Sequence, residues 1–326
     1  MPNKSFDVNW TDVTSKHLAL MKAFLAQFWR DEMKISTIGI WSARDHVRSA
    51  CLLFMAIVTL VSFSRTASAQ AVIAQLSDIH LCSSKAPHAA INLNSAVQMI
   101  NRMTVDDVVV SGDIGESPTC WLQAKSILAN LKVPVHYVPG NHDVHTLDVS
   151  VYRSIFGSDY YRFQVKNVDV IVIDSQLLGN YDNYSATSPP PLPTYTQALS
   201  AQMLNWMNSL VTTEQNAIAA GRVVIAVQHI PVARDYGFPP DTKPYWIISD
   251  PYRTREMNAL HALGVKNVLA GHWHSANIFD WGNITWHVAP STSCLPWGGT
   301  LGFAVHTITA AGNVLTEFVD LPNAVP

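Results

Sequence analysis

The sequence predicts an α/β protein built on a parallel β-sheet. Short apolar runs rich in β-branched residues alternate along the chain with runs whose apolar residues recur at helical spacing. The strand-like runs at residues 71–76, 105–110, 133–138, 222–227 and 265–270 each stop abruptly at a group of Asp, His or Asn residues. Because parallel strands end at one edge of their sheet, these polar groups are expected to meet there, where such sheets form ligand sites.

Three strands separated by two helices make up the first half of the predicted fold. The run at 71–76 lacks alternation, which is typical of a strand buried on both faces. Apolar residues at helical spacing predict helices at 91–103 and 121–131, between strands at 105–110 and 133–138. The strand-helix-strand-helix-strand order implies parallel pairing of the three strands.

The second half begins with a predicted β-hairpin. Residues 160–165 and 168–173 alternate in polarity and are separated by a turn at Lys166 and Asn167. A proline-rich loop follows, and Ser200 is expected to cap the next helix, whose apolar stripe points to a core role. The remaining elements are a strand at 222–227, a helix at 255–263, a strand at 265–270, two strands completing a second sheet at 284–288 and 302–308, and a last strand at 314–319.

The long loop at 231–251 is rich in aromatic residues and proline. It contains Tyr236, Phe238, Tyr245 and Trp246. Long ordered loops beside a site tend to be functional, so this loop is a candidate wall of a substrate site. A packed surface loop is the alternative.

Charge argues against a nucleic-acid-binding surface. Charged residues make up 14% of the chain, and residues 70–326 hold 13 Lys and Arg against 19 Asp and Glu. An acidic protein of this kind is not expected to bind duplex nucleic acid through its phosphates. If it binds a phosphate, bound metal is the expected source of positive charge.

The N-terminal region resembles a targeting segment. Arg44, His46 and Arg48 form a basic flank, residues 50–63 form an uncharged apolar run, and Ala67 and Ala69 provide a small-x-small cleavage site. The apolar run is shorter than the roughly 20 residues of a membrane span. Residues 33–69 are therefore predicted to be a signal peptide, with 1–32 an extension of doubtful status and 70–326 the functional domain. The mature protein would be periplasmic or secreted, without a stable membrane span; the alternative is an outward-facing membrane-anchored protein.

Three cysteines remain after that cleavage: Cys82, Cys120 and Cys294. Cys82 and Cys120 each follow a predicted ligand-bearing strand end, so a disulfide between them is possible in an oxidising compartment. Buried free thiols are the alternative reading.

The polar groups match an ordered set of motifs. They are DxH at Asp78 and His80, GDxxE at Asp113 and Glu116, GNHD at residues 140–143, an isolated His229, and GHxH at His272 and His274. Asp, His and Asn are ligands suited to Fe, Mn, Zn or Ni. This arrangement resembles the calcineurin-like metallophosphoesterases, of the single-domain phosphatase or phosphodiesterase type.

The resemblance implies a fold and a metal centre. The fold would be a four-layer α/β/β/α sandwich with two mixed β-sheets, as in metallo-dependent phosphatases. One metal would be held by Asp78, His80 and His274, and the other by Asn141, His229 and His272. Asp113 would bridge the two ions.

The resemblance also implies the reaction. Two ions can share a hydroxide whose pKa is lowered towards neutrality, and they can neutralise charge on the phosphoryl oxygens. His142 would act as general acid or as a clamp on the phosphoryl group. The expected substrate is a small phosphomonoester, phosphodiester or phosphoprotein. The alternative is a non-catalytic structural or interaction protein that binds two metals.

Other polar and aromatic residues in or near the motifs are not expected to bind metal. Glu116 and Asp143 are expected to orient ligand imidazoles, with surface exposure as the alternative. Trp273, between two predicted ligands, should point away from the metals into the core. His287 and His306 lie within strands and are expected to be ordinary core or surface histidines.

Overall fold

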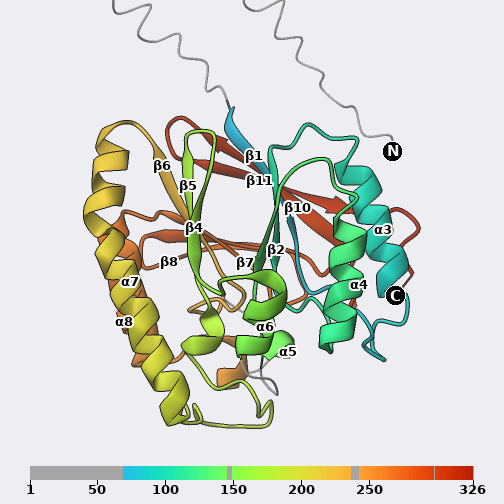
Figure 1. The fold of residues 1–326 in the computed structure, drawn as a ribbon, viewed down its shortest axis with the longest axis horizontal. Coiled ribbons are helices and arrows are strands. Elements are labelled where there is room, and N and C mark those ends of the chain that lie inside the picture. The colour runs from blue at the N-terminus through green and yellow to red at the C-terminus, as the bar shows by residue number, and fades with distance from the viewer. Residues whose placement is uncertain (1–68, 145–148, 236–241, 297, 326) are drawn as a thin grey trace, which may run out of the picture. The chain divides into compact units, whose positions relative to one another are not determined.

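The computed structural model describes residues 69–144, 149–235, 242–296 and 298–325 (Figure 1). The chain from Ala67 to Pro326 forms one compact unit. The predicted extension at 1–32 and all but the last residue of the predicted signal peptide at 33–69 lie outside the described residues, so both stay predictions. No helix in the described ranges is long and apolar enough to span a membrane.

The first sheet contains five strands in the order β11-β10-β1-β2-β3. Their bounds are β1 Ala69–Leu76, β2 Asp107–Ser111, β3 Val135–Val138, β10 Gly302–Thr309 and β11 Val314–Asp320. The parallel pairing of β1, β2 and β3 agrees with the order of elements in the sequence. The assignment of β10 to the second sheet was wrong. β10 pairs antiparallel with β1, with Ile73 opposite His306, a long-range contact that local patterns do not reveal.

The second sheet contains six strands in the order β4-β5-β6-β7-β9-β8. Their bounds are β4 Tyr161–Val165, β5 Val168–Val172, β6 Val223–Val227, β7 Asn267–Ala270, β8 Asn277–Trp281 and β9 Ile284–Val288. The predicted hairpin is present as antiparallel β4 and β5, while β5, β6, β7 and β9 run parallel. β8 was not predicted, because four of its five residues are exposed or only half-buried and it carries no apolar run.

The helices are α3 Ala89–Ile100, α4 Pro118–Leu128, α5 Asn141–Val144, α6 Val149–Phe156, α7 Thr194–Ala219 and α8 Tyr252–Leu263. Two short 3-10 turns, η1 Ser175–Leu177 and η2 Pro244–Trp246, complete the described elements. The expectation that Ser200 caps a helix was wrong. α7 begins directly after Pro193, and Ser200 is buried inside it. The helix therefore begins upstream of the apolar stripe from which it was predicted.

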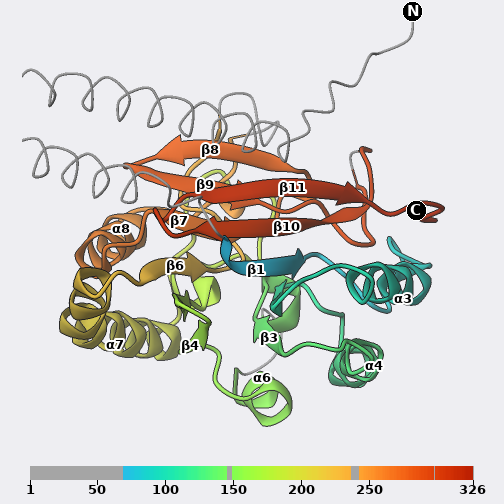
Figure 2. The same ribbon diagram turned by 90° about the horizontal axis from the view of Figure 1, so that it is seen from above.

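The sheets lie face to face between two layers of helices (Figure 2). Apolar residues of both sheets, such as Ile73, Val109, Val170 and Ile225, form the buried layer between them. The outer face of the first sheet packs on α3 and α4, and that of the second on α7 and α8. The fold is therefore the expected α/β/β/α sandwich with two mixed sheets.

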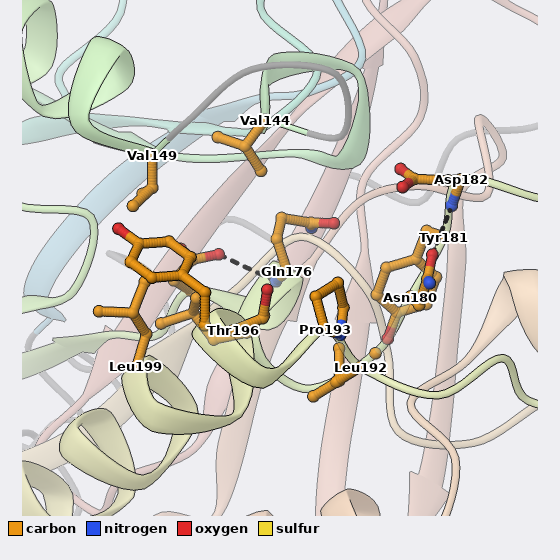
Figure 3. Close-up of a pocket in the computed structure, with 14 residues that line it drawn as sticks. Val144, Val149, Gln176, Asn180, Tyr181, Asp182, Leu192, Pro193, Thr196 and Leu199 are labelled. Carbon is orange, nitrogen blue, oxygen red and sulfur yellow. Dashed lines mark hydrogen bonds between the residues drawn. The ribbon is translucent and has the colours of Figure 1, made fainter.

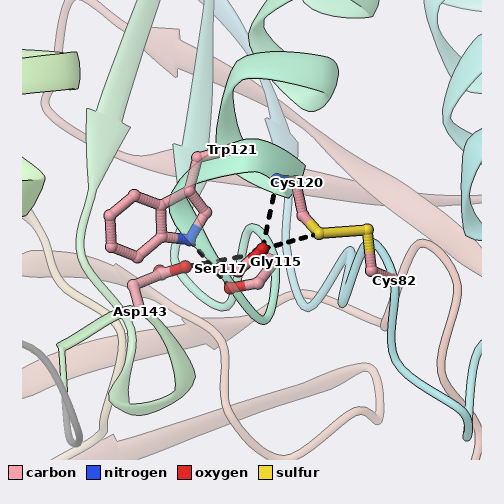
Figure 4. Close-up of a disulfide and its surroundings, with 6 residues drawn as sticks. All are labelled: Cys82, Gly115, Ser117, Cys120, Trp121 and Asp143. Atoms are coloured by element: carbon pink, nitrogen blue, oxygen red, sulfur yellow. Dashed lines mark hydrogen bonds between the residues drawn. A yellow bond between two sulfur atoms is a disulfide. The ribbon is translucent and has the colours of Figure 1, made fainter.

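A disulfide joins Cys82 and Cys120, and Cys294 is a buried free thiol. The bond connects the loop after β1 to the first turn of α4, next to Gly115 and Trp121 (Figure 4). Trp121 Nε1 donates a hydrogen bond of 2.8 Å to the carbonyl of Gly115. Of the two readings of these cysteines, the structure therefore has the disulfide.

Replacing both Cys82 and Cys120 by serine is expected to destabilise the fold by about 2–4 kcal/mol. The bond spans 38 residues of sequence, and its loss releases that loop in the unfolded chain. Urea unfolding of wild type and the double variant measures the difference. The Cys294→Ser variant is the matched control. Equal midpoints for wild type and the double variant would show that the bond does not form in solution.

Glu256 on α8 gives an expected pH dependence of stability. Burial raises the pKa of Glu256 to about 8, against a smaller opposite effect of Gln228. The unfolded chain releases this proton near pH 4.5, so the contribution is fully present below that pH and is lost as pH rises through 8. Relative to Glu256→Gln, wild type should lose up to about 1.4 kcal/mol per pH unit across this window. Urea unfolding of both proteins at several pH values measures this difference in the free energy of unfolding. Parallel pH profiles for the two proteins would contradict the raised pKa of Glu256.

Candidate metal centre

The predicted metal ligands gather at the carboxyl ends of five strands. The loop after β1 carries Asp78 and His80, and Asp113 follows β2. Asn141 begins α5 directly after β3, and His229 follows β6. His272 and His274 follow β7. Six of the seven side chains are at most 3% exposed, and His274 is half-buried. The residues therefore lie at strand ends, as predicted, but the strands belong to two sheets rather than to one.

The first donor group comprises Asp78, His80, Asp113 and His274, whose ligand atoms all lie within 4.8 Å of one another. His274 Nε2 lies 3.2 Å from both Asp78 Oδ1 and His80 Nε2. His80 Nε2 lies 3.5 Å from Asp113 Oδ2. Atoms bound to one ion at about 2.1 Å are separated by about 3.0–3.4 Å, so these spacings suit a shared cation.

The second donor group comprises Asp113, His229 and His272. His229 Nε2 lies 3.3 Å from Asp113 Oδ2, the same oxygen that faces His80 in the first group. Asp113 thus belongs to both groups, as a bridging ligand would. Asn141 lies beside this group, because its Nδ2 donates to the Tyr245 hydroxyl at 2.9 Å and the rings of Tyr245 and His272 are 4.9 Å apart.

Three buried polar atoms at the centre have no hydrogen-bond partner in the described part of the chain: Asp78 Oδ1, Asn141 Oδ1 and His229 Nε2. Leaving such atoms buried and unpaired is costly, so native proteins rarely do it. All three are metal-ligand atoms, and metal ions would satisfy them. The residues present therefore fit two ions.

The loops that carry the donors have an unusual backbone. Asp78, His80, Asp113, His272 and His274 all have φ between 50 and 71°, in the left-handed region. Non-glycine residues adopt this region rarely, and it concentrates at functional sites. Gly140 allows a close approach, since a Cβ there would lie 2.2 Å from Asp113 Oδ1. This strain is repeated at three separate loops, which indicates that the loops are shaped for the donor groups.

Backbone carbonyls fix the orientation of three donor imidazoles. Nδ1 of His229 donates to the carbonyl of Ser111 at 2.7 Å, and Nδ1 of His274 to that of Cys294 at 2.8 Å. Nε2 of His272 donates to the Tyr245 carbonyl at 2.9 Å. The other ring nitrogen of each is then left for the centre, an arrangement typical of metal-binding histidines.

The ionisation of two donor histidines also suits a metal. Burial lowers the pKa of His272 well below its usual value, and burial lowers the pKa of His274 to about 4. Both imidazoles are therefore neutral at pH 7, the form that binds metal. Asp113 is anionic: burial opposes its charge, but neighbouring histidines, led by His229, hold its pKa well below the usual value.

His142 and Glu116 lie beside the first donor group. His142 is 34% exposed in its side chain, and Glu116 contacts both His142 Nδ1 at 3.3 Å and His80 Nδ1 at 3.1 Å. Burial disfavours charge on His142, but Asp113 and Glu116 outweigh it and raise its pKa to about 9. A proton is therefore held at the open side of the centre, and Glu116 orients an imidazole as expected.

Asp143 has a different role from the one predicted. Its carboxylate accepts hydrogen bonds from the backbone N–H groups of Gly140 at 2.8 Å, Ile114 at 2.9 Å and Gly115 at 3.3 Å. It therefore ties the loop after β3 to the loop after β2, and holds backbone rather than an imidazole.

Three other expectations concern core residues. Trp273 is fully buried, and its Nε1 donates to the carbonyl of Trp246. His287 and His306 are buried and share the hydroxyl of Thr316, each at 2.8 Å. All three are core residues, as expected.

Sequence reasoning did not identify Cys294 as a candidate metal donor or Tyr184 as part of the cavity wall. The thiol of Cys294 lies within 4.8 Å of the ligand nitrogens of His80 and His274. Tyr184, from the proline-rich loop, lines the same cavity of about 450 Å³ as His142, Tyr245 and Trp246. The prediction that residues 231–251 form a wall holds for Tyr245 and Trp246, while Tyr236 and Phe238 lie outside the described residues. No local pattern marked Tyr184 or Cys294.

A second cavity of about 300 Å³ is lined in part by Tyr181 (Figure 3). Its lining includes Gln176, Leu192 and Leu199. The ring of Tyr181 is 6.3 Å from that of His272, so the cavity is a neighbour of the second donor group.

Comparisons with known proteins agree with this geometry. Residues 71–276 match the family model of calcineurin-like phosphoesterases. The chain is 27% identical over 186 residues to the serine/threonine-protein phosphatase CPPED1 of Bos taurus, which covers 55% of this chain and 53% of that protein. It is 22% identical over 216 residues to a protein of Fibrobacter succinogenes named as a probable cyclic nucleotide phosphodiesterase, covering 62% of this chain and 70% of that one. The chain thus spans about half the length of CPPED1.

A solved structure supports the fold. A dimetal phosphatase from Danio rerio superposes with a TM-score of 0.58 at 16% identity, covering 78% of this chain and 100% of that one. The family match covers more than half of the chain and includes every predicted metal ligand. The protein belongs to the calcineurin-like phosphoesterase family.

Proposed function

We propose that this chain hydrolyses phosphoesters with two bound metal ions. Asp78, His80 and His274 would hold one ion, Asn141, His229 and His272 the other, and Asp113 both. The observation that carries this proposal is the Asp113 carboxylate shared by both donor groups, together with three buried atoms of predicted ligands that lack hydrogen-bond partners in the described residues. When bound, the ions would polarise the phosphoryl group and supply the nucleophile for its hydrolysis.

The chain's own residues would do the rest. The Asp113 carboxylate accepts the backbone N–H of His142 at 2.8 Å, so the loop that carries His142 is fixed to the centre. Glu116 orients the imidazole of His142 from the other side. His142 would then give its proton to the leaving oxygen, or clamp the phosphoryl oxygens.

The two named relatives support different substrates, a phosphoprotein and a cyclic nucleotide. Monoester and diester hydrolysis are both compatible with the donor set, and so are Fe, Mn, Zn and Ni. For location we propose the periplasm or the exterior of the cell. The Cys82–Cys120 disulfide supports an oxidising compartment.

Metal analysis combined with a panel of phosphomonoesters and phosphodiesters tests the proposal. The expected result is two metals per chain and hydrolysis of at least one ester class, lost on chelation and restored by one of the four candidate metals. Two bound metals without hydrolysis of any ester would favour the alternative, a non-catalytic metal-binding protein.

A further inference from the structure

Aromatic side chains form one wall of the cavity over the candidate metal centre. Tyr184, Tyr245 and Trp246 contact one another edge to face, with ring centroids 5.1–5.8 Å apart and interplanar angles of 74–88°. They come from two separate loops. Edge-to-face packing of this kind stabilises a fixed arrangement of rings.

This aromatic wall is attached to the donor residues. The Tyr245 hydroxyl accepts from Asn141, and the Tyr245 carbonyl accepts from His272. The Trp246 carbonyl accepts from Trp273, which lies between the two GHxH histidines. The wall therefore keeps a fixed position relative to the place where a phosphoryl group would bind.

Tyr184 is the member of the wall that remains accessible. It is 42% exposed, whereas Trp246 is 1% exposed. Lys243 Nζ lies 3.7 Å from the centroid of the Tyr184 ring, a cation–π contact that holds the ring in place. An exposed aromatic ring that lines a cavity offers a surface on which a ligand ring can pack.

The rest of the cavity lining includes hydrogen-bonding and cationic side chains. Ser83, Ser84 and Lys85 line the cavity, providing two hydroxyl groups and an ammonium group. The cavity volume of about 450 Å³ lies in the range of pockets that enclose a small molecule. The cavity thus combines a phosphoryl position, hydroxyl and cationic groups, and an aromatic surface.

We propose that the substrate is a nucleotide, whose base packs on Tyr184 while its phosphoester lies at the metal centre. The sugar hydroxyls, or a further phosphate, would be bound by Ser83, Ser84 and Lys85. This inference rests on the proposed phosphoesterase function and selects the nucleotide over the phosphoprotein. A planar base can pack on the exposed part of the Tyr184 ring, whereas the short aliphatic side chain of a phosphoserine or phosphothreonine offers no ring for such packing.

The test compares adenosine 5′-monophosphate and adenosine 3′,5′-cyclic monophosphate with ribose 5-phosphate and a phosphoserine peptide. Wild type should prefer at least one adenine ester. Tyr184→Ala should raise KM for that ester by about 5- to 100-fold, the usual contribution of base stacking, and change KM for ribose 5-phosphate much less. Tyr184→Phe should restore most of the affinity, since it keeps the ring. Tyr195→Ala is the control, because Tyr195 is 57% exposed and lines the other cavity.

Two outcomes separate this inference from the proposed function. Hydrolysis of ribose 5-phosphate or of the phosphopeptide as efficiently as the adenine esters would overturn the nucleotide assignment and leave the phosphoesterase intact. If no ester is hydrolysed, calorimetric binding of adenosine 5′-monophosphate to the manganese-loaded protein still tests whether the cavity binds a nucleotide. If Tyr184→Ala weakens binding of adenosine 5′-monophosphate no more than it weakens binding of ribose 5-phosphate, the assignment is rejected.

Discussion

His142→Ala should keep both metals and lose activity by about 10²- to 10⁴-fold towards esters with poor leaving groups. An alkoxide is a poor leaving group unless it is protonated, and His142, with 34% of its side chain exposed, is the imidazole at the open side of the centre. A nitrophenolate needs no such proton, so the loss on nitrophenyl esters should be much smaller. Rates on an alkyl and a nitrophenyl ester, measured with metal content, give the comparison.

The control for this experiment is His261→Ala, an exposed histidine on α8. It should behave as wild type on both esters. An equal loss on both esters with His142→Ala would reject the acid role and favour a clamp on the phosphoryl oxygens. Loss of a metal would instead show that His142 is itself a ligand, in the group it forms with His80 and Glu116.

Asp113→Asn is expected to have the other large effect, because Asp113 is the one side chain shared by both donor groups. An amide has one oxygen and no charge, so it cannot bridge two cations as a carboxylate does. We expect loss of at least one metal per chain and a fall in activity of about 10³-fold or more. Metal analysis after dialysis, and rates at saturating metal, measure the two effects.

Glu317→Gln on β11 is the matched control, because it removes one exposed carboxylate far along the sequence from any donor. Circular dichroism and urea unfolding separate metal loss from misfolding. Asp113 is buried among histidines, so the variant should stay folded and its histidines should lose an anionic neighbour. Two metals retained at full occupancy would contradict the bridging role.

Local sequence was sufficient for much of the fold. Apolar β-branched runs predicted β1, β2, β3, β6, β7 and β9, because parallel strands covered by other layers are rich in such side chains. Alternating polarity around a turn predicted β4 and β5. The failures lie where partners are distant. β10 joins β1 across more than 200 positions of sequence, and β8 has little apolar pattern of its own. The hydrophobic period identifies a strand but does not identify its neighbour.

The sequence by itself determined which residue types end each strand. The order of these residue types along the chain gives the motifs, and the motifs indicate the family. The predicted ligands in them are Asp78, His80, Asp113, Asn141, His229, His272 and His274. Parallel pairing brings the carboxyl ends of β1, β2 and β3 to one edge and those of β6 and β7 to another. The face-to-face packing of the two sheets then brings the two sets of residues together.

Only the tertiary structure decided the shape of the site. It showed that Asp143 accepts hydrogen bonds from backbone N–H groups, and it brought Tyr184 and Cys294 to the cavity. It also decided that Cys82 and Cys120 are bonded. The physical reason is common to all of these. Backbone φ at the donor loops and contacts between distant loops depend on packing of the whole sandwich, and a linear pattern does not contain them.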